Sequence, residues 1–130
     1  MNRFTFLSGL ALVMFLSACG APGGRSLTLA EGDSGKTIEM RTGETLTISL
    51  LGNPTTGYLW EAESGDPNVL KQVGEAEFEP DSDALGSGGK VSLHFEAVAP
   101  GEMHLRLVYH RPWEQGVPPE KSFEVNIVVQ

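Results

Sequence analysis

Apolar and polar residues alternate with a period of two over most of the chain after residue 26, and no stretch there has the spacing of an amphipathic helix. The alternating segments are 27–29, 38–40, 44–51, 58–64, 69–79, 91–97, 103–109 and 123–129. Turn residues separate them, and segment 69–79 has the weakest pattern. Short alternating segments of this kind predict an all-β fold, an immunoglobulin-like β-sandwich of about seven antiparallel strands.

The connections between the predicted strands differ in length at the two ends of the sandwich. If successive strands run antiparallel, the compact turns 65–68 and 99–102 fall at one end. The opposite end then receives the loops 52–57, 80–89 and 110–120, each longer than a chain reversal requires. Long loops gathered at one end of a rigid scaffold are a common place for binding, so we predict a binding surface there.

The first loop, residues 52–57, contains residues that restrict its shape. Asn53 can cap its own turn, and Pro54 fixes φ and keeps the preceding residue extended. Thr55 and Thr56 are β-branched, so their side chains lose little freedom on contact with a partner. Gly57 allows a backbone angle that other residues resist. We therefore expect a stiff loop.

The second and third loops carry further candidate contact residues. The second loop ends in the run Leu85, Gly86, Ser87, Gly88 and Gly89. Such a run either lets its backbone approach a partner closely or forms a flexible loop. In the third loop Arg111 and Trp113 are residue types enriched at binding hot spots, and Pro112 stiffens the chain between them. The alternative for Trp113 is an indole folded back onto the core.

These three motifs, in this order and with this spacing, resemble those of chagasin-type inhibitors of papain-like cysteine proteases. The residues that carry the resemblance are Asn53, Pro54, Thr55, Thr56, Gly57, Tyr58, Leu85, Gly86, Ser87, Gly88, Gly89, Arg111, Pro112 and Trp113. The resemblance covers nearly all of residues 27–130. It implies an immunoglobulin-like sandwich and a reversible, non-covalent inhibitor whose three loops occlude the active-site cleft of a papain-like (clan CA) protease.

The resemblance also implies a role for each motif. Thr55 and Thr56 match positions placed against the catalytic cysteine and histidine of the protease. The backbone of residues 85–89 would lie along the substrate cleft. Trp113 would pack against aromatic surface on the enzyme, while Arg111 would support the neighbouring loop or reach the rim of the cleft.

The chain departs from the family pattern in small ways. Ser87 occupies the free position of the glycine motif, and Tyr58 stands in place of a phenylalanine. The acidic residues Asp81, Asp83 and Glu114 lie near the loops and are candidates for tuning which protease is preferred.

The first residues of the chain predict export and a lipid anchor. Arg3 precedes an apolar run over residues 4–16, and this run is too short for an ordinary membrane span. The sequence at 16–19 resembles the lipobox of bacterial lipoproteins, in which the cysteine is lipidated. We interpret residues 1–18 as a lipoprotein signal peptide, Cys19 as the lipidation site and 19–26 as a flexible tether to the inhibitor domain, 27–130. The alternative is an ordinary secretory signal cut near Ala18.

Gly20 follows the cysteine, and without an aspartate there the lipoprotein rule points to the outer membrane, with the domain facing the periplasm. Removal of Arg3 leaves eight basic residues against 17 acidic ones, a net charge of −9. Such a surface is unsuited to nucleic acid. Because Cys19 is the single cysteine, no internal disulfide can form. We expect a monomer without a cofactor that meets the membrane only through its lipid.

An enzyme and a different kind of binding module are the alternatives. The alternation places His94 and His104 on neighbouring strands, both facing away from the core, where they could share a metal. No third ligand accompanies them, so solvated surface histidines are the preferred interpretation. No catalytic motif is present, and we expect no enzymatic activity. An immunoglobulin-like adhesion or envelope-assembly module that binds without inhibiting fits the anchor and the sandwich, but does not explain the three motifs.

Overall fold

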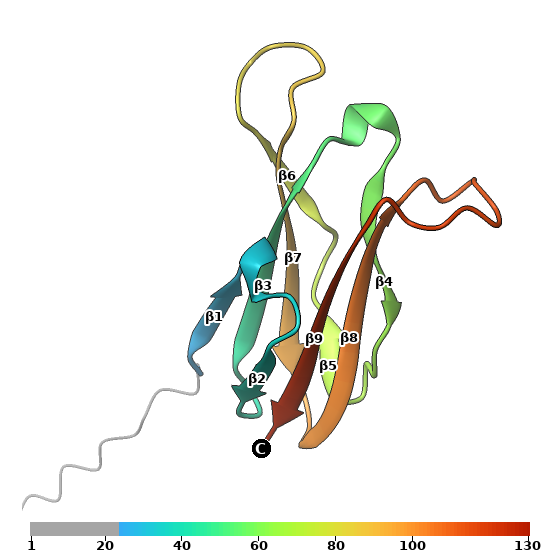
Figure 1. The fold of residues 1–130 in the computed structure, drawn as a ribbon. Coiled ribbons are helices and arrows are strands. Elements are labelled where there is room, and N and C mark those ends of the chain that lie inside the picture. The colour runs from blue at the N-terminus through green and yellow to red at the C-terminus, as the bar shows by residue number, and fades with distance from the viewer. Residues whose placement is uncertain (1–23) are drawn as a thin grey trace, which may run out of the picture.

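Residues 24–130 are described by a computed structural model, and over these residues the chain forms nine β-strands and two single-turn 3₁₀ helices (Figure 1). The strands are β1 (Ser26–Leu29), β2 (Thr37–Met40), β3 (Thr45–Gly52), β4 (Leu59–Ser64), β5 (Leu70–Gln72), β6 (Glu77–Pro80), β7 (Gly89–Ala97), β8 (Gly101–His110) and β9 (Lys121–Val129). The helices are η1 (Glu31–Asp33) and η2 (Pro54–Thr56). The predicted signal peptide and Cys19 lie outside the described residues. Within 24–130, no helix has the length and apolar character needed to cross a bilayer.

The strands pack as two sheets, and the predicted immunoglobulin-like sandwich is confirmed. One sheet has the order β1-β3-β7-β5, with β6 also paired to β7; the other has the order β2-β9-β8-β4. The pairs β1–β3 and β2–β9 are parallel, and the remaining pairs are antiparallel. The parallel pairs arise because the chain starts along one sheet and crosses at η1 to the edge of the other, without a hairpin.

The weak segment 69–79 forms two strands instead of one. β5 and β6 pair with successive stretches of the same neighbour, β7. Between them Gly74 has a φ of 73°, a left-handed conformation that few other residues adopt. The bend at this glycine accounts for the faint alternation of the segment and for part of the higher strand number.

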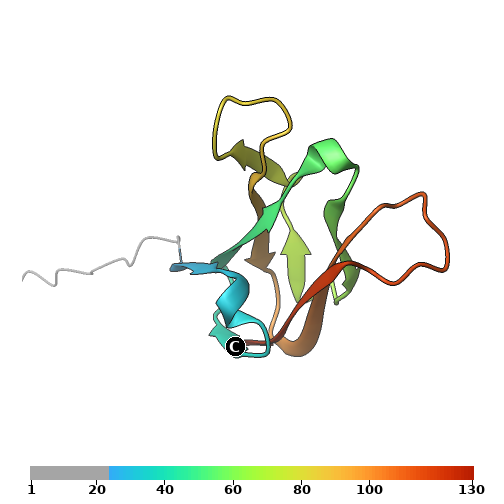
Figure 2. The same cartoon turned by 45° about the horizontal axis from the view of Figure 1, so that its top comes forward.

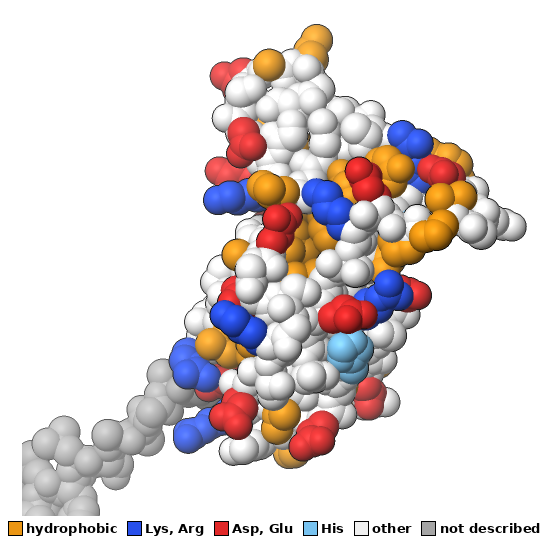
Figure 3. Space-filling view, viewed as in Figure 1, with side chains coloured by type: hydrophobic (Ala, Val, Ile, Leu, Met, Phe, Trp, Pro, Cys, Tyr) orange, Lys and Arg blue, Asp and Glu red, His pale blue; other side chains and the backbone are white. Residues whose placement is uncertain are grey.

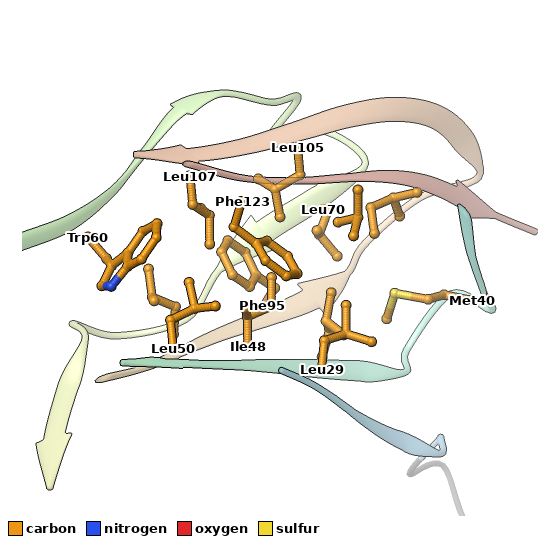
Figure 4. Close-up of a cluster of buried hydrophobic side chains, with 14 of the residues drawn as sticks. Leu29, Met40, Ile48, Leu50, Trp60, Leu70, Phe95, Leu105, Leu107 and Phe123 are labelled. Carbon is orange, nitrogen blue, oxygen red and sulfur yellow. The ribbon is translucent and has the colours of Figure 1, made fainter. Parts of the chain in front are cut away.

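The core lies between the sheets and is filled by every second residue of the long strands (Figure 4). The largest side chains that are fully buried are Phe123, Leu46, Ile48, Leu50, Leu93, Leu107, Ile127 and Val125. Full burial of such a side chain contributes roughly 1.5–3 kcal/mol. The central strands therefore form a rigid base from which the loops at one end project.

Candidate functional site: three loops at one end of the sandwich

The three long loops project from the same end of the sandwich (Figures 1 and 2). The first joins β3 to β4, the second joins β6 to β7, and the third joins β8 to β9. We call the surface formed by residues 52–57, 80–89 and 110–120 the three-loop surface. The compact turns after β4 and β7 lie at the opposite end, as the sequence predicts.

The first loop is held by its own polar groups. Asn53 precedes η2, and its Oδ1 accepts hydrogen bonds from the N–H of Thr55, at 3.1 Å, and from the hydroxyl of Thr55, at 2.6 Å. The hydroxyl of Thr56 donates to the carbonyl of Asn53 at 2.6 Å. Gly57 ends the turn with a φ of 84°. Both threonine hydroxyls are thus engaged within the loop, which gives the stiffness that the sequence predicts.

The second loop is also braced from within. Ser82 and Ser87 share a hydroxyl hydrogen bond of 3.1 Å, and the N–H of Asp81 donates to the carbonyl of Gly88 at 3.0 Å. Gly86 adopts a φ of 77° beside Leu85, whose side chain is fully exposed at the tip. These bonds support a defined loop over the flexible alternative.

Gly89 is buried and opens β7, so it differs from the other glycines of the motif. A Cβ at this position would collide with the backbone carbonyl of Glu79 on β6. A Cβ at Gly88 would make only an ordinary contact, 3.6 Å from the carbonyl of Gly52. Gly89 therefore supports the base of the second loop, while Gly86 and Gly88 belong to its accessible part.

The third loop leans on the first through Arg111 and Trp113. Arg111 Nε donates to the carbonyl of Thr56 at 3.0 Å, and the guanidinium lies 4.4 Å from the centre of the Tyr58 ring. Of the two roles implied for Arg111, the structure shows it supporting the neighbouring loop. Trp113 is 66% exposed, and its indole rests on Gly57. It does not fold back onto the core.

Aromatic residues below the loops belong to the alternating segments 58–64 and 103–109, but alternation does not predict their polar contacts. Tyr109 of β8 stacks on Tyr58 with ring centres 5.2 Å apart, and its ring lies tilted against that of Trp60 with centres 5.1 Å apart. Trp60 Nε1 donates to the carbonyl of Leu51 at 3.0 Å, which joins the two sheets. The one signal available in the sequence is that aromatic residues with a polar atom stand at strand ends, where that atom can reach a partner.

A hollow of about 470 Å³ opens between the loops, with Tyr109 and Gly52 in its lining. Its charged lining residues are Asp81, Arg111, Glu120 and Lys121. Figure 3 shows apolar side chains at the tip of the second loop and along the third loop, on either side of this hollowed region. Of the acidic residues predicted to tune preference, Glu114 is engaged by Arg111 at 3.3 Å, while Asp81 and Asp83 are exposed.

The prediction that His94 and His104 lie on neighbouring strands is wrong. His94 is on β7 and His104 is on β8, and the turn between these strands crosses from one sheet to the other. Each ring has its own polar partners: Thr47 and Glu77 for His94, Asn126 and Glu124 for His104. In the described part of the chain, no group of three or more His, Cys, Asp or Glu side chains is arranged to hold a metal ion.

This geometry defines an immunoglobulin-like domain with three long loops at one end, the first of which is hydrogen-bonded to both of the others. The sequence profile of the family described as "Chagasin family peptidase inhibitor I42" matches residues 39–127, and the chain belongs to that family.

Similar proteins agree with this assignment. Chagasin of Trypanosoma cruzi is 39% identical over 84 residues, which are 62% of this chain and 76% of chagasin. Amoebiasin-1 of Entamoeba histolytica is 33% identical over 106 residues, 80% of this chain and all of that protein. The crystal structure of EhICP2, a cysteine protease inhibitor from Entamoeba histolytica, shares the fold with a TM-score of 0.72 at 23% identity, covering 82% of this chain and 97% of that one.

Proposed function

We propose that this protein inhibits papain-like cysteine proteases reversibly and without a covalent bond, by filling the active-site cleft with the three-loop surface. The observation that carries the proposal is the bracing between loops. Asn53 Nδ2 donates to the carbonyl of Gly86 at 2.9 Å, and Arg111 Nε donates to the carbonyl of Thr56 at 3.0 Å. A surface ordered before binding loses less conformational entropy in the complex, which favours tight association.

Each loop has a part suited to a cleft. The first loop presents η2 with Pro54 at its start. In the proposed complex this narrow turn lies against the catalytic cysteine and histidine of the protease. The second offers accessible backbone at Gly86 and Gly88 and the exposed side chain of Leu85. The third offers the exposed indole of Trp113, an aromatic anchor for the enzyme surface.

A titration of papain with the purified protein tests this proposal. Residual protease activity is expected to fall as inhibitor is added and to return on dilution, because nothing in the proposed contact forms a bond to the catalytic sulfur. Full activity in the presence of excess protein would overturn the proposal. It would favour the alternative, an adhesion or envelope-assembly module that binds without inhibiting.

We also propose that the domain is held at the bacterial outer membrane by lipid on Cys19, with no other membrane contact. The lipobox-like residues 16–19 support this assignment. β1 runs parallel to β3, and Ser26 pairs with Thr45 at the start of that strand, so the described chain begins at the end opposite the loops. An anchor on this side would leave the three-loop surface pointing away from the membrane.

Substitution of the predicted lipidation site provides a direct check. Cys19→Ser is expected to move the protein from the membrane fraction to a soluble or unprocessed fraction. The reason is that each buried methylene of an acyl chain contributes roughly 0.8 kcal/mol to membrane binding. Mass spectrometry of the wild-type protein should find acyl chains on Cys19. An unmodified thiol there would contradict the anchor.

A further inference from the structure

Tyr109 lies beneath the three-loop surface, at the place where the two sheets meet. It belongs to β8 of one sheet, is 5% exposed, and its Oη accepts a hydrogen bond of 2.8 Å from the N–H of Asn53. Asn53 is the first residue after β3 of the other sheet, beyond the last pair of the β3–β7 ladder, Gly52 with Gly89. The phenol oxygen therefore accepts the hydrogen bond that a neighbouring strand would accept if the ladder continued. This bond holds the first loop at the point where it leaves its sheet.

Asn53 extends this constraint to the second loop. While its backbone N–H is held by Tyr109, its side-chain Oδ1 caps η2 and its Nδ2 donates to the carbonyl of Gly86 at 2.9 Å. Gly86 is the residue of the second loop with the left-handed φ of 77°. One residue thus links the buried hydroxyl, the first loop and the turn of the second loop.

The ring of Tyr109 holds the other side of the first loop and the start of the third. Tyr58, just after the first loop, stacks on it at 5.2 Å, and the Arg111 guanidinium covers Tyr58 at 4.4 Å. Arg111 is two residues beyond Tyr109 and bonds to the carbonyl of Thr56. All three loops are therefore connected to this one side chain through direct or single-residue contacts.

We propose that the Tyr109 hydroxyl is the positioning group that sets the placement of the three loops relative to one another, with Asn53 passing its effect to the second loop. Tyr109 is buried and acts through Asn53, so it is not itself a contact residue. The expected effect of Tyr109 on protease affinity rests on the proposed function. A cleft that contacts all three loops at once binds less tightly when the loops are displaced from one another. The effect of Tyr109 on loop order is a property of the free protein.

Tyr109→Phe tests the inference, since it removes the acceptor oxygen and keeps the ring. In the free full-length protein, amide hydrogen exchange at Asn53 and Ser87 is expected to rise by about tenfold or more, while the amides of β9 keep their protection. The inhibition constant for papain is expected to rise about tenfold, or about 1.4 kcal/mol. Ser49→Ala is the matched control, because it removes a hydroxyl hydrogen bond of 3.1 Å to Ser92 between β3 and β7, away from the loops. It should leave the inhibition constant unchanged.

Asn53→Asp distinguishes the contact between Tyr109 and Asn53 from the contact between Asn53 and Gly86. It also provides the test if Tyr109→Phe does not fold. It keeps the Oδ1 cap on η2 but removes the donor to Gly86. Exchange at Ser87 should rise, while the Asn53 amide position stays protected by Tyr109. Unchanged exchange at Ser87 in the variants that fold would overturn the inference, as would a rise spread evenly over all strands. If wild-type protein fails to inhibit papain, the proposed function fails, and the exchange results still decide the role of Tyr109.

Discussion

At the scale of single residues, Gly57 and Trp113 depend on each other. Gly57 ends η2 with a left-handed φ of 84°. Because Gly57 has no side chain, the indole of Trp113 can pack directly against its backbone. A Cβ at this position would collide with the ring of Trp113. The motif residues of the first and third loops are therefore linked by shape as well as by the Arg111 hydrogen bond.

Trp113→Ala is expected to weaken protease binding by roughly 2–4 kcal/mol, mostly through faster dissociation. The domain should keep its melting temperature, because the indole is 66% exposed and lies outside the core. Inhibition kinetics and a thermal melt measure the two effects separately. A variant that unfolds, or a folded variant that inhibits normally, would remove Trp113 from the contact surface.

Gly57→Ala is expected to reduce both stability and inhibition. The left-handed backbone costs a residue with a Cβ about 1 kcal/mol, and the methyl group displaces the indole of Trp113. Gly43→Ala is the control, since its φ is 95° but a Cβ there meets nothing within 4 Å. Denaturant unfolding should show similar losses for the two variants, and only Gly57→Ala should raise the inhibition constant. Equal inhibition by the two variants would show that the packing of the Trp113 indole on Gly57 does not contribute to inhibition.

At the scale of elements, alternation predicted which face of the long strands β3, β7 and β9 is buried, but it did not assign strands to sheets. The periodicity is a local property, whereas pairing joins residues far apart, such as Thr45 with Glu96. The parallel β1–β3 and β2–β9 pairs, and the placement of β7 and β8 in opposite sheets, depend on where the chain crosses between layers. The metal hypothesis for His94 and His104 failed for this reason.

The loops were predicted more completely than the contacts that join them. Proline, glycine and β-branched residues predict a stiff first loop from the local sequence. In the structure this loop is held by hydrogen bonds among Asn53, Thr55 and Thr56. The bond from Asn53 to Gly86 spans 33 residues, and that from Arg111 to Thr56 spans 55. No local pattern encodes such bonds, because they exist only once the sandwich has brought the loops to one end.

Gly89→Ala tests how the second loop depends on its supporting strands. The added Cβ would meet the carbonyl of Glu79, so β6 is expected to separate from β7 at the base of the loop. Amide exchange in β6 should increase, and inhibition should weaken although the residue itself is buried. Gly88→Ala is the matched variant, since its Cβ makes an ordinary contact and should leave β6 protected. Protected β6 amides in Gly89→Ala would refute this dependence.

At the scale of the whole molecule, the entry of the described chain and the long loops lie at opposite ends of the sandwich. The described chain enters at one end, through β1, and the three-loop surface occupies the other. The buried core lies between these two ends, and most of its side chains come from β3, β7, β8 and β9. We therefore expect the protein to bind a protease through the three-loop surface without taking part in its chemistry.

Binding should be independent of protease catalysis. The hydroxyls of Thr55 and Thr56 both donate to Asn53, and the first loop presents no electrophile except ordinary peptide carbonyls. Pro54 and the η2 turn hold these carbonyls in a compact shape poorly suited to nucleophilic attack, so cleavage should be slow. A protease whose catalytic cysteine is changed to alanine should bind with a Kd within about tenfold, or about 1.4 kcal/mol, of the active enzyme. Calorimetry with both forms measures this, and mass spectrometry follows the inhibitor over time. Loss of binding to the inactive form, or accumulation of chain cut between Asn53 and Tyr58, would indicate a substrate-like trap instead of a rigid plug.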